Sequence, residues 1–232
     1  LFTRFSANVS EKNAEGFFTT LSLGIRSLLL VGLPLGVLLA TFSEPLIGLI
    51  FEHGEFDARG TELASRALWG HAPGMALAAM STLVSSAALA YGRKWSVVGV
   101  MVTMVALNAY LDWVLSQQMQ LFGIAISTTI VSGIRVFLLI CLLMPKLLID
   151  RELMICLIRT VILSVLLAIP GLIELFGDFG FQNQLWWRIT ILCIAAVWAG
   201  VVFLFTWKRF LRVEWMQLTK LRKSAATHVQ KL

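Results

Sequence analysis

The sequence predicts an all-α protein that crosses a membrane several times, as a bundle of six transmembrane helices. Hydrophobic residues make up 58% of the 232 residues and charged residues 14%, whereas soluble domains average about 45–50% and about 25%. Six segments are also long and nearly free of charge. Transmembrane strands would alternate apolar and polar residues over roughly ten positions. These segments do not alternate, so helices are predicted.

The predicted spans follow one another at 28–42, 67–92, 95–115, 121–144, 154–176 and 185–207. Most reach the roughly 20 residues that a helix needs to cross about 30 Å of hydrocarbon. The first is long enough if it starts near Leu21, with the charged end of Arg26 extending to the membrane surface. We therefore expect a cytoplasmic link over 1–20, a transmembrane region over 21–207 and a basic cytoplasmic tail over 208–232.

Prolines and cysteines inside the spans are interpreted as structural. Each proline frees a backbone carbonyl that a neighbouring helix must satisfy, which favours a packed bundle with kinks: Pro34, Pro73 and Pro170. Free cysteine behaves as a small hydrophobic residue, and three scattered thiols are too sparse for a metal site: Cys141, Cys156 and Cys193. We predict no catalytic residue, no metal site and no cofactor.

The basic residues predict the orientation of the spans. Lys and Arg collect in cytoplasmic loops, and here they concentrate at the first span, in alternate connections and after the last span. Both termini are therefore expected on the cytoplasmic side. The segment "WKRFLRVEWMQLTKLRKSAA" carries apolar residues at helical spacing among basic ones and should lie along the anionic inner leaflet. Nucleic-acid binding is not expected, because the positive charges follow the topology instead of forming one patch.

An acidic stretch, "LIFEHGEFDARGTE" at 49–62, joins the first two spans on the expected outer side. It has neither the two-histidine helical spacing of a zinc protease nor the periodicity of an EF-hand. Paired catalytic carboxylates are an alternative to a water-facing charged turn, which is our interpretation. Gly54 indicates a tight turn, and Phe51 with Phe56 would hold it against the helix ends. The acids expected to face water are Glu44, Glu52, Glu55, Asp57 and Glu62.

Arg135 is the candidate substrate-binding residue deepest in a span, about 13 Å from the cytoplasmic end at 1.5 Å per residue. Charged residues at such depth usually face a bundle interior or a water-filled cavity. Its neighbours in "STTIVSGIRV" are small or hydroxylated, which lets helices approach closely. The alternatives are attraction of a lipid diphosphate, or a structural role in which the side chain reaches the surface or pairs with a carbonyl.

Three further polar residues lie in the outer parts of their spans. Asn108 precedes Asp112 by one helical turn on the same face, and His71 lies in the preceding span. We predict that they share a polar pocket, with Asn108 contributing to substrate binding. His71 and Asp112 are the candidate ion-coupling residues, for protons or sodium. A plain interhelical hydrogen bond is the alternative.

Two longer stretches, "EPLIGLIFEHGEF" and "ALWGHAPGMALAAMSTLVSSAALAYGRKWSVVGVMVTMVALNAYLDWVL", carry a specific resemblance. They resemble the second half of the MurJ/MviN family of lipid II flippases, within the multidrug/oligosaccharidyl-lipid/polysaccharide exporter superfamily. The matching features are the Glu44-Pro45 helix end, the Phe51-x-x-Gly54-x-Phe56 turn and Asn108. The resemblance implies that the six spans are the last helices of a fourteen-helix, two-lobe transporter in a bacterial inner membrane.

The same resemblance implies a function and partners. The chain would flip a lipid-linked oligosaccharide by alternating access, among membrane lipids and with an N-terminal lobe that lies outside it. The arginine cluster of that family falls in helices outside this sequence, so no residue here takes that role. Two alternatives stay open: an exopolysaccharide-repeat or drug exporter of the same superfamily, and a membrane scaffold that transports nothing.

Overall fold

The computed structural model describes residues 5, 6, 9, 11, 13–143, 151–176 and 185–206, and these described ranges contain helices and no strand. The predicted all-α class is confirmed. The helices of the bundle are α2 (Ala14–Thr41), α3 (Ser43–Phe51), α4 (Ala58–Ala90), α5 (Lys94–Leu143), α6 (Arg151–Phe176) and α7 (Leu185–Thr206). The predicted basic tail over 208–232 lies outside the described residues.

Helix α5 is a hairpin of two arms. Its 50 residues are continuous except at Gln120, where the backbone leaves the helical region with φ 53° and ψ −133°. The chain reverses there, within the "SQQMQ" that was predicted to separate two spans. Gly123 allows the reversal to be tight, because a Cβ at this position would collide with the carbonyl of Leu115 on the other arm. The first arm is about 39 Å long and the second about 35 Å at 1.5 Å per residue.

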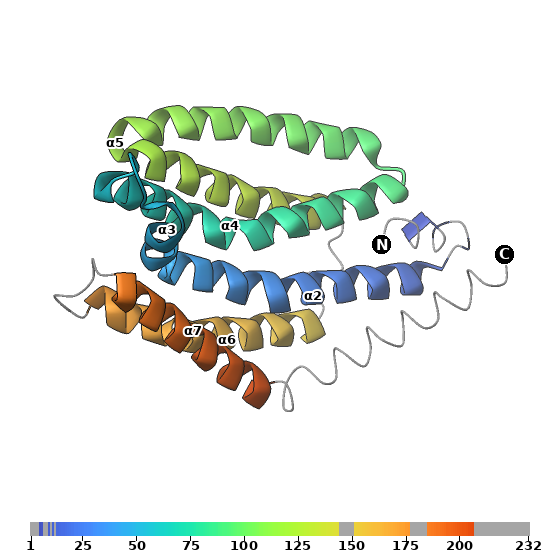
Figure 1. Cartoon of the computed structure of the whole chain (residues 1–232). Helices are drawn as coiled ribbons and strands as arrows, with labels where there is room; N and C mark the ends of the chain where they lie inside the picture. The colour runs from blue at the N-terminus through green and yellow to red at the C-terminus, as the bar shows by residue number, and fades with distance from the viewer. Residues whose placement is uncertain are drawn as a thin grey trace.

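Helix α2 lies between two layers of helices (Figure 1). On one side it packs against α4, which in turn packs against α5; on the other side it packs against α6, which is joined by α7. Small residues bring α2 and α4 close together: a Cβ on Gly36 would lie 2.6 Å from the carbonyl oxygen of Ala72, and one on Gly32 would lie 3.0 Å from the Cβ of Ala76. The two backbones are therefore in direct contact.

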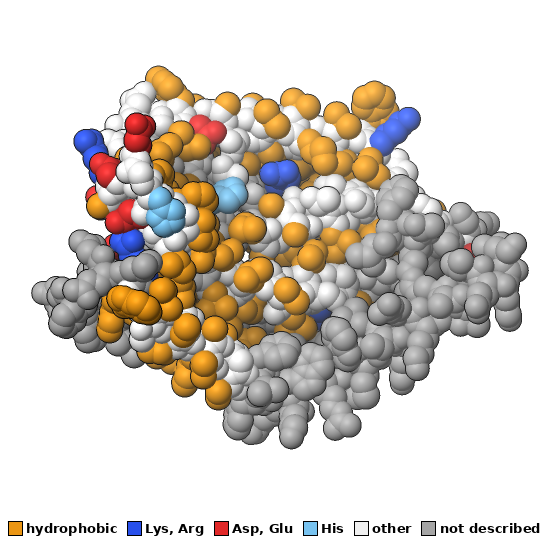
Figure 2. Space-filling model, viewed as in Figure 1, with side chains coloured by type: hydrophobic (Ala, Val, Ile, Leu, Met, Phe, Trp, Pro, Cys, Tyr) orange, Lys and Arg blue, Asp and Glu red, His pale blue; other side chains and the backbone are white. Residues whose placement is uncertain are grey.

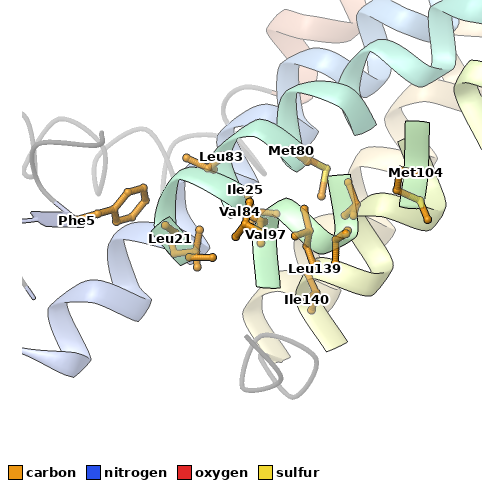
Figure 3. Close-up of a cluster of buried hydrophobic side chains, with 14 of the residues drawn as sticks. Phe5, Leu21, Ile25, Met80, Leu83, Val84, Val97, Met104, Leu139 and Ile140 are labelled. Atoms are coloured by element: carbon orange, nitrogen blue, oxygen red, sulfur yellow. The ribbon is translucent and has the colours of Figure 1, made fainter. Parts of the chain in front are cut away.

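The main hydrophobic core lies where α2, α4 and both arms of α5 meet (Figure 3). Leu21 and Ile25 of α2, Val84 of α4 and Leu139 of α5 are completely buried. Smaller apolar clusters join Phe42 to α7, and α6 to α7. Arg26 is also buried among these helices, with 9% of the residue exposed. Its guanidinium lies 4.0 Å from the carboxylate of Glu152, in the first turn of α6. The predicted extension of Arg26 to the membrane surface stays a prediction.

Four helices of the described ranges are long and apolar enough to cross a membrane: α2, α4, α5 and α6. Because α5 doubles back, it supplies two crossings, and α7 contributes a shorter apolar helix over Trp186–Val202. The six predicted spans therefore correspond to six helical segments. Figure 2 shows hydrophobic side chains along the length of the helices, with acidic and histidine side chains gathered at the end where α3 lies and α5 turns.

The segment after α2 differs from the prediction in one respect. The sequence Glu44-Pro45 was expected to be a helix end, but a new helix, α3, begins at Ser43 after a break at Phe42. Proline is tolerated there because first-turn N–H groups have no acceptor within the helix. At the other end, α2 begins at Ala14, inside the predicted cytoplasmic link. Helix ends do not mark a membrane surface, so the domain boundaries stay predictions.

Candidate functional site

The α5 hairpin brings two predicted site residues together. Asn108 and Asp112 are one turn apart on the first arm, and the Asn108 amide donates to the Asp112 carboxylate at 2.7 Å. Ser127, on the second arm, donates its hydroxyl to the other carboxylate oxygen. The hairpin creates this second contact, because its reversal at Gln120 places residues 112 and 127 opposite each other. This group of Asn108, Asp112 and Ser127 is called the Asp112 cluster below.

The hydrogen bonds of the Asp112 carboxylate are made within the Asp112 cluster. Both carboxylate oxygens accept a hydrogen bond from a neutral side chain, and the ion pairs seen among the described residues do not include Asp112. A carboxylate without a basic partner can hold a cation or a proton. The arrangement can therefore support the predicted ion coupling and, equally, a purely structural link between the two arms.

His71 is placed differently from the prediction of a shared pocket. Its side chain is exposed on α4, and it makes no hydrogen bond or ion pair with the residues that the structure describes. The neighbouring Gly70 instead contacts α5, where the Thr129 hydroxyl donates to its carbonyl at 2.7 Å. The structure thus brings Asn108 and Asp112 together and leaves His71 outside their cluster. Its coupling role stays a prediction.

Arg135 lies in the second arm of α5, half-buried in the bundle. Its Nε is buried, and within the described part of the chain it has no hydrogen-bond acceptor. Helices α4 and this arm run in parallel, since Gly74 lies against Thr129 and Gly133 against Leu77. Arg135 therefore lies near the middle of the bundle. A buried donor without an acceptor costs about 1–3 kcal/mol, and an anionic group beside the guanidinium would remove that cost.

An ion pair at the end of the bundle joins the acidic turn to α7. The Arg188 guanidinium lies 2.8 Å from the Glu52 carboxylate, and the Arg188 side chain is only 7% exposed. The Thr61 hydroxyl donates to the same carboxylate at 2.9 Å. Burial raises the pKa of the Glu52 carboxyl, but hydrogen bonds from Arg188 and Thr61, with the charges of Arg188 and His53, outweigh it and leave the pKa below its ordinary value.

The acidic turn is otherwise as predicted. Gly54 has a φ of 61°, and the Phe51 and Phe56 rings lie 6.2 Å apart. Asp57 caps α4 by accepting from the Gly60 N–H at 2.9 Å. Glu52 is the exception to the expected row of water-facing acids, because its side chain is 24% exposed and paired with Arg188. That pair could not be found by motif, because 136 positions separate the two residues in the sequence.

Metal ligation was not predicted. Within the described residues, His, Cys, Asp and Glu side chains form no group of three or more that could hold a metal ion. The three cysteines are free; Cys156 is buried in α6 and Cys193 is exposed on α7.

Comparisons with known proteins extend these observations. The family model described as lipid II flippase MurJ matches residues 1–197. A curated relative from Buchnera aphidicola subsp. Schizaphis graminum (strain Sg), named "Probable lipid II flippase MurJ", is 28% identical over 139 residues, which cover 60% of this chain and 27% of that protein. A solved structure described as "Lipid II flippase MurJ, inward closed conformation" matches with a TM-score of 0.67 and 17% identity, over 90% of this chain and 43% of that chain.

This chain spans less than half the length of both proteins. At 17% identity the structural match bears on the fold alone. The family match over 1–197, by contrast, takes in most of the 232 residues. Together with its apolar helices, this makes the protein a multi-pass membrane protein, and the chain belongs to the lipid II flippase MurJ family.

Proposed function

We propose that the chain is part of a flippase that moves a polyprenyl-diphosphate-linked glycan, of the lipid II kind, across the bacterial inner membrane by alternating access. Family membership and the bundle of membrane-crossing helices support this proposal. The observation that carries it is the buried Arg135 Nε, which has no acceptor among the described residues. A diphosphate passing through the bundle would supply that acceptor, since guanidinium groups bind phosphate through paired N–H donors.

The position of Arg135 favours a functional role on energetic grounds. An arginine at the centre of a membrane helix costs about 2.5–3.5 kcal/mol on insertion scales, so leucine would be more favourable at a passive position. Ser132 and Gly133 precede it, and such small residues let a neighbouring helix approach closely. In this proposal the protein moves lipid-linked glycan without making or breaking covalent bonds. It acts as a transporter among membrane lipids, together with an N-terminal lobe, and not as an enzyme.

Asp112 and Asn108 have a second part in the proposal. The Asp112 carboxylate links the two arms of α5 through Asn108 and Ser127. Proton or sodium binding would compete for the same oxygens, and would change how tightly the arms are joined. His71, exposed on α4, is the other candidate for this coupling.

The test uses the chain together with the complementary N-terminal lobe in reconstituted vesicles. Arg135→Ala should abolish flipping, whereas Arg135→Lys should retain part of it, because lysine keeps the charge and loses the planar fork. Arg159→Ala is the control, since Arg159 is also a half-buried arginine of a membrane helix. The Arg159→Ala protein should flip the lipid at close to the wild-type rate when the two proteins are compared at equal abundance in the membrane. An Arg135→Ala protein that flips at the wild-type rate would reject the role.

The proposed orientation places both termini on the cytoplasmic side. The cleft between α4 and the α5 reversal supports one part of it, because it shows that the acidic end of α4 and Gln118 lie at the same end of the bundle. In a background without Cys141, Cys156 and Cys193, cysteines at Glu55 and Gln118 should react with an impermeant thiol reagent from outside the cell. A cysteine at Lys146 should not react. Labelling of that cysteine in intact cells would show that the orientation is the opposite of the one proposed.

A further inference from the structure

A cleft lies where the first turns of α4 meet the reversal of α5. Its volume is about 520 Å³, which is within the range of about 300–1,000 Å³ typical of small-molecule sites. None of the candidate site residues Arg135, Asn108, Asp112 or His71 lines it. The cleft is therefore a separate feature of the fold.

The polar lining of the cleft consists of hydrogen-bond donors without an acid. Arg66, Gln118 and Gln120 reach it from α4 and from the α5 reversal, and no carboxylate is among its lining residues. Arg66 pairs with Glu62 on the preceding turn of its own helix at 2.7 Å, and its side chain is 67% exposed. Exposed pairs of this kind contribute little to stability, so an anionic ligand can replace Glu62 at low cost.

The remaining lining is apolar. The Trp69 and Phe122 rings lie 5.7 Å apart, and Leu63 belongs to the same wall. Trp69 is 48% exposed, so one part of the indole is free to contact a ligand. A small soluble anion would leave this wall unused, whereas a ligand with an anionic head and an apolar chain fits both parts of the cleft.

The backbone at Gln120 is held in an unusual conformation at this cleft. Its φ of 53° is the only positive value at a non-glycine residue in the described ranges, and such conformations cost of order 1–3 kcal/mol and cluster at ligand sites. The reversal at Gln120 is what carries Gln118 and Phe122 to opposite sides of one turn, within reach of α4.

We propose that this cleft binds an anionic phospholipid of the surrounding bilayer. The phosphate would accept from Arg66 and from the side-chain amides of Gln118 and Gln120, and an acyl chain would lie against Trp69 and Phe122. The membrane is the source because α4 and α5 are membrane-crossing helices. The cleft lies at one end of these helices, and in this proposal the headgroup region of the bilayer reaches it there. The proposal does not depend on the transport proposed above, because it concerns lipid binding by this chain at equilibrium.

Native mass spectrometry of the chain, released from nanodiscs of phosphatidylcholine with phosphatidylglycerol, tests the assignment. A phosphatidylglycerol adduct should be retained in preference to phosphatidylcholine. Arg66→Gln should weaken its binding by about tenfold or more, as expected for the loss of a charge-assisted hydrogen bond. Arg59→Gln makes the same change of charge on the same helix, outside the cleft, and should leave the adduct unchanged.

Two further pairs of variants separate the cleft from general attraction of charge. Glu62→Gln releases Arg66 from its partner and should strengthen binding, whereas Glu55→Gln, an exposed acid at the same end, should strengthen it less. Trp69→Ala should weaken binding, while Trp113→Ala, an exposed tryptophan outside the cleft, should not. Circular dichroism would verify that each variant keeps its helices.

Four results would overturn the proposal. Equal retention of the two lipids, or equal effects of Arg66→Gln and Arg59→Gln, would show that the cleft does not select an anionic headgroup. Displacement of the adduct by millimolar inorganic phosphate would identify a soluble-anion site. Displacement by geranylgeranyl diphosphate at the concentration of the phospholipid would identify an isoprenoid diphosphate as the better ligand. A flipping assay is not needed for any of these outcomes.

Discussion

The two arms of α5 hold their charged residues in opposite states. Asp112, on the first arm, has both carboxylate oxygens engaged by Asn108 and Ser127. Arg135, on the second arm, has a buried Nε without an acceptor among the described residues. Both residues are half-buried in the same hairpin. Burial within the protein therefore does not distinguish them, but the state of their hydrogen bonds does.

This difference separates a charge whose hydrogen bonds are satisfied within the protein from one whose hydrogen bonds are incomplete. The Glu52–Arg188 pair belongs with Asp112, because both carboxylates have partners within the protein. Removing a matched partner leaves a polar group without a hydrogen bond, which costs stability. Removing Arg135 takes away a group whose hydrogen bonds are incomplete. Mutations at the two kinds of site should therefore change the free energy of unfolding in opposite directions.

The largest expected effect is the contrast between Asp112→Ala and Arg135→Leu. Asp112→Ala should lower the free energy of unfolding by about 1–3 kcal/mol, because Asn108 and Ser127 lose their acceptor. Arg135→Leu should leave it unchanged or raise it, since leucine suits an apolar helix better. Equilibrium unfolding in mixed micelles, followed by circular dichroism, measures both. Comparable losses of unfolding free energy in the two variants would contradict the proposed difference between the arms.

A smaller effect is expected at the Glu52–Arg188 pair. Glu52→Gln should lower stability by about 1.5 kcal/mol, the low end for a hydrogen bond to a charged group, because Glu52 is partly exposed. The pKa of Glu52 is lowered in the folded protein. Its contribution is therefore present above the ordinary carboxyl pKa and is lost as the pH falls through the lowered value.

The variant should consequently lose stability at neutral pH and match the wild type at acidic pH. Glu55→Gln provides the control, because Glu55 lies in the same turn and is exposed. Thermal unfolding of the two variants across the acidic range would reveal the difference. A Glu52→Gln profile parallel to the wild-type profile would show that Glu52 does not stabilise the contact between the turn and α7.

The smallest effect isolates the bond between the two arms. Ser127→Ala removes the donor to Asp112 and should cost about 0.5–1 kcal/mol. Thr128→Val is the matched control, because the Thr128 hydroxyl donates to the Ile124 carbonyl of its own helix. Measured together, the two variants should differ in stability. Equal losses would mean that the bond across the hairpin adds nothing beyond ordinary contacts within a helix.

Much of the fold could be predicted because a membrane limits what a sequence can form. Apolar segments of about 20 residues have few alternatives to a helix, and "SQQMQ" marked the reversal at Gln120. The separate helix α3 was missed, because Pro45 was taken as the end of a helix when it lies in the first turn of another. The contact of Arg26 with Glu152 was also missed, because Glu152 lies on a helix far along the chain.

Contacts within one helix could be predicted, whereas contacts between helices could not. The Asn108–Asp112 bond follows from a spacing of four residues. Predicting the contact of Ser127 with Asp112 required the register of the hairpin. A reversal near residue 120 does place Ser127 opposite Asp112. The proximity of His71 to this pair was not confirmed, because equal depth in a membrane does not fix the face of a helix. The functional roles of all four candidate residues stay predictions.

The direct backbone contact between Gly36 on α2 and Ala72 on α4 has a mechanical consequence. Helices separated by long side chains can slide as rotamers adjust, but two backbones in contact have no such intermediate layer to deform. We therefore expect helices α2 and α4 to move together. Because α2 also packs against α6, any displacement of α4 is carried through the whole thickness of the bundle to α6, and a β-branched residue at Gly36 would separate the two layers.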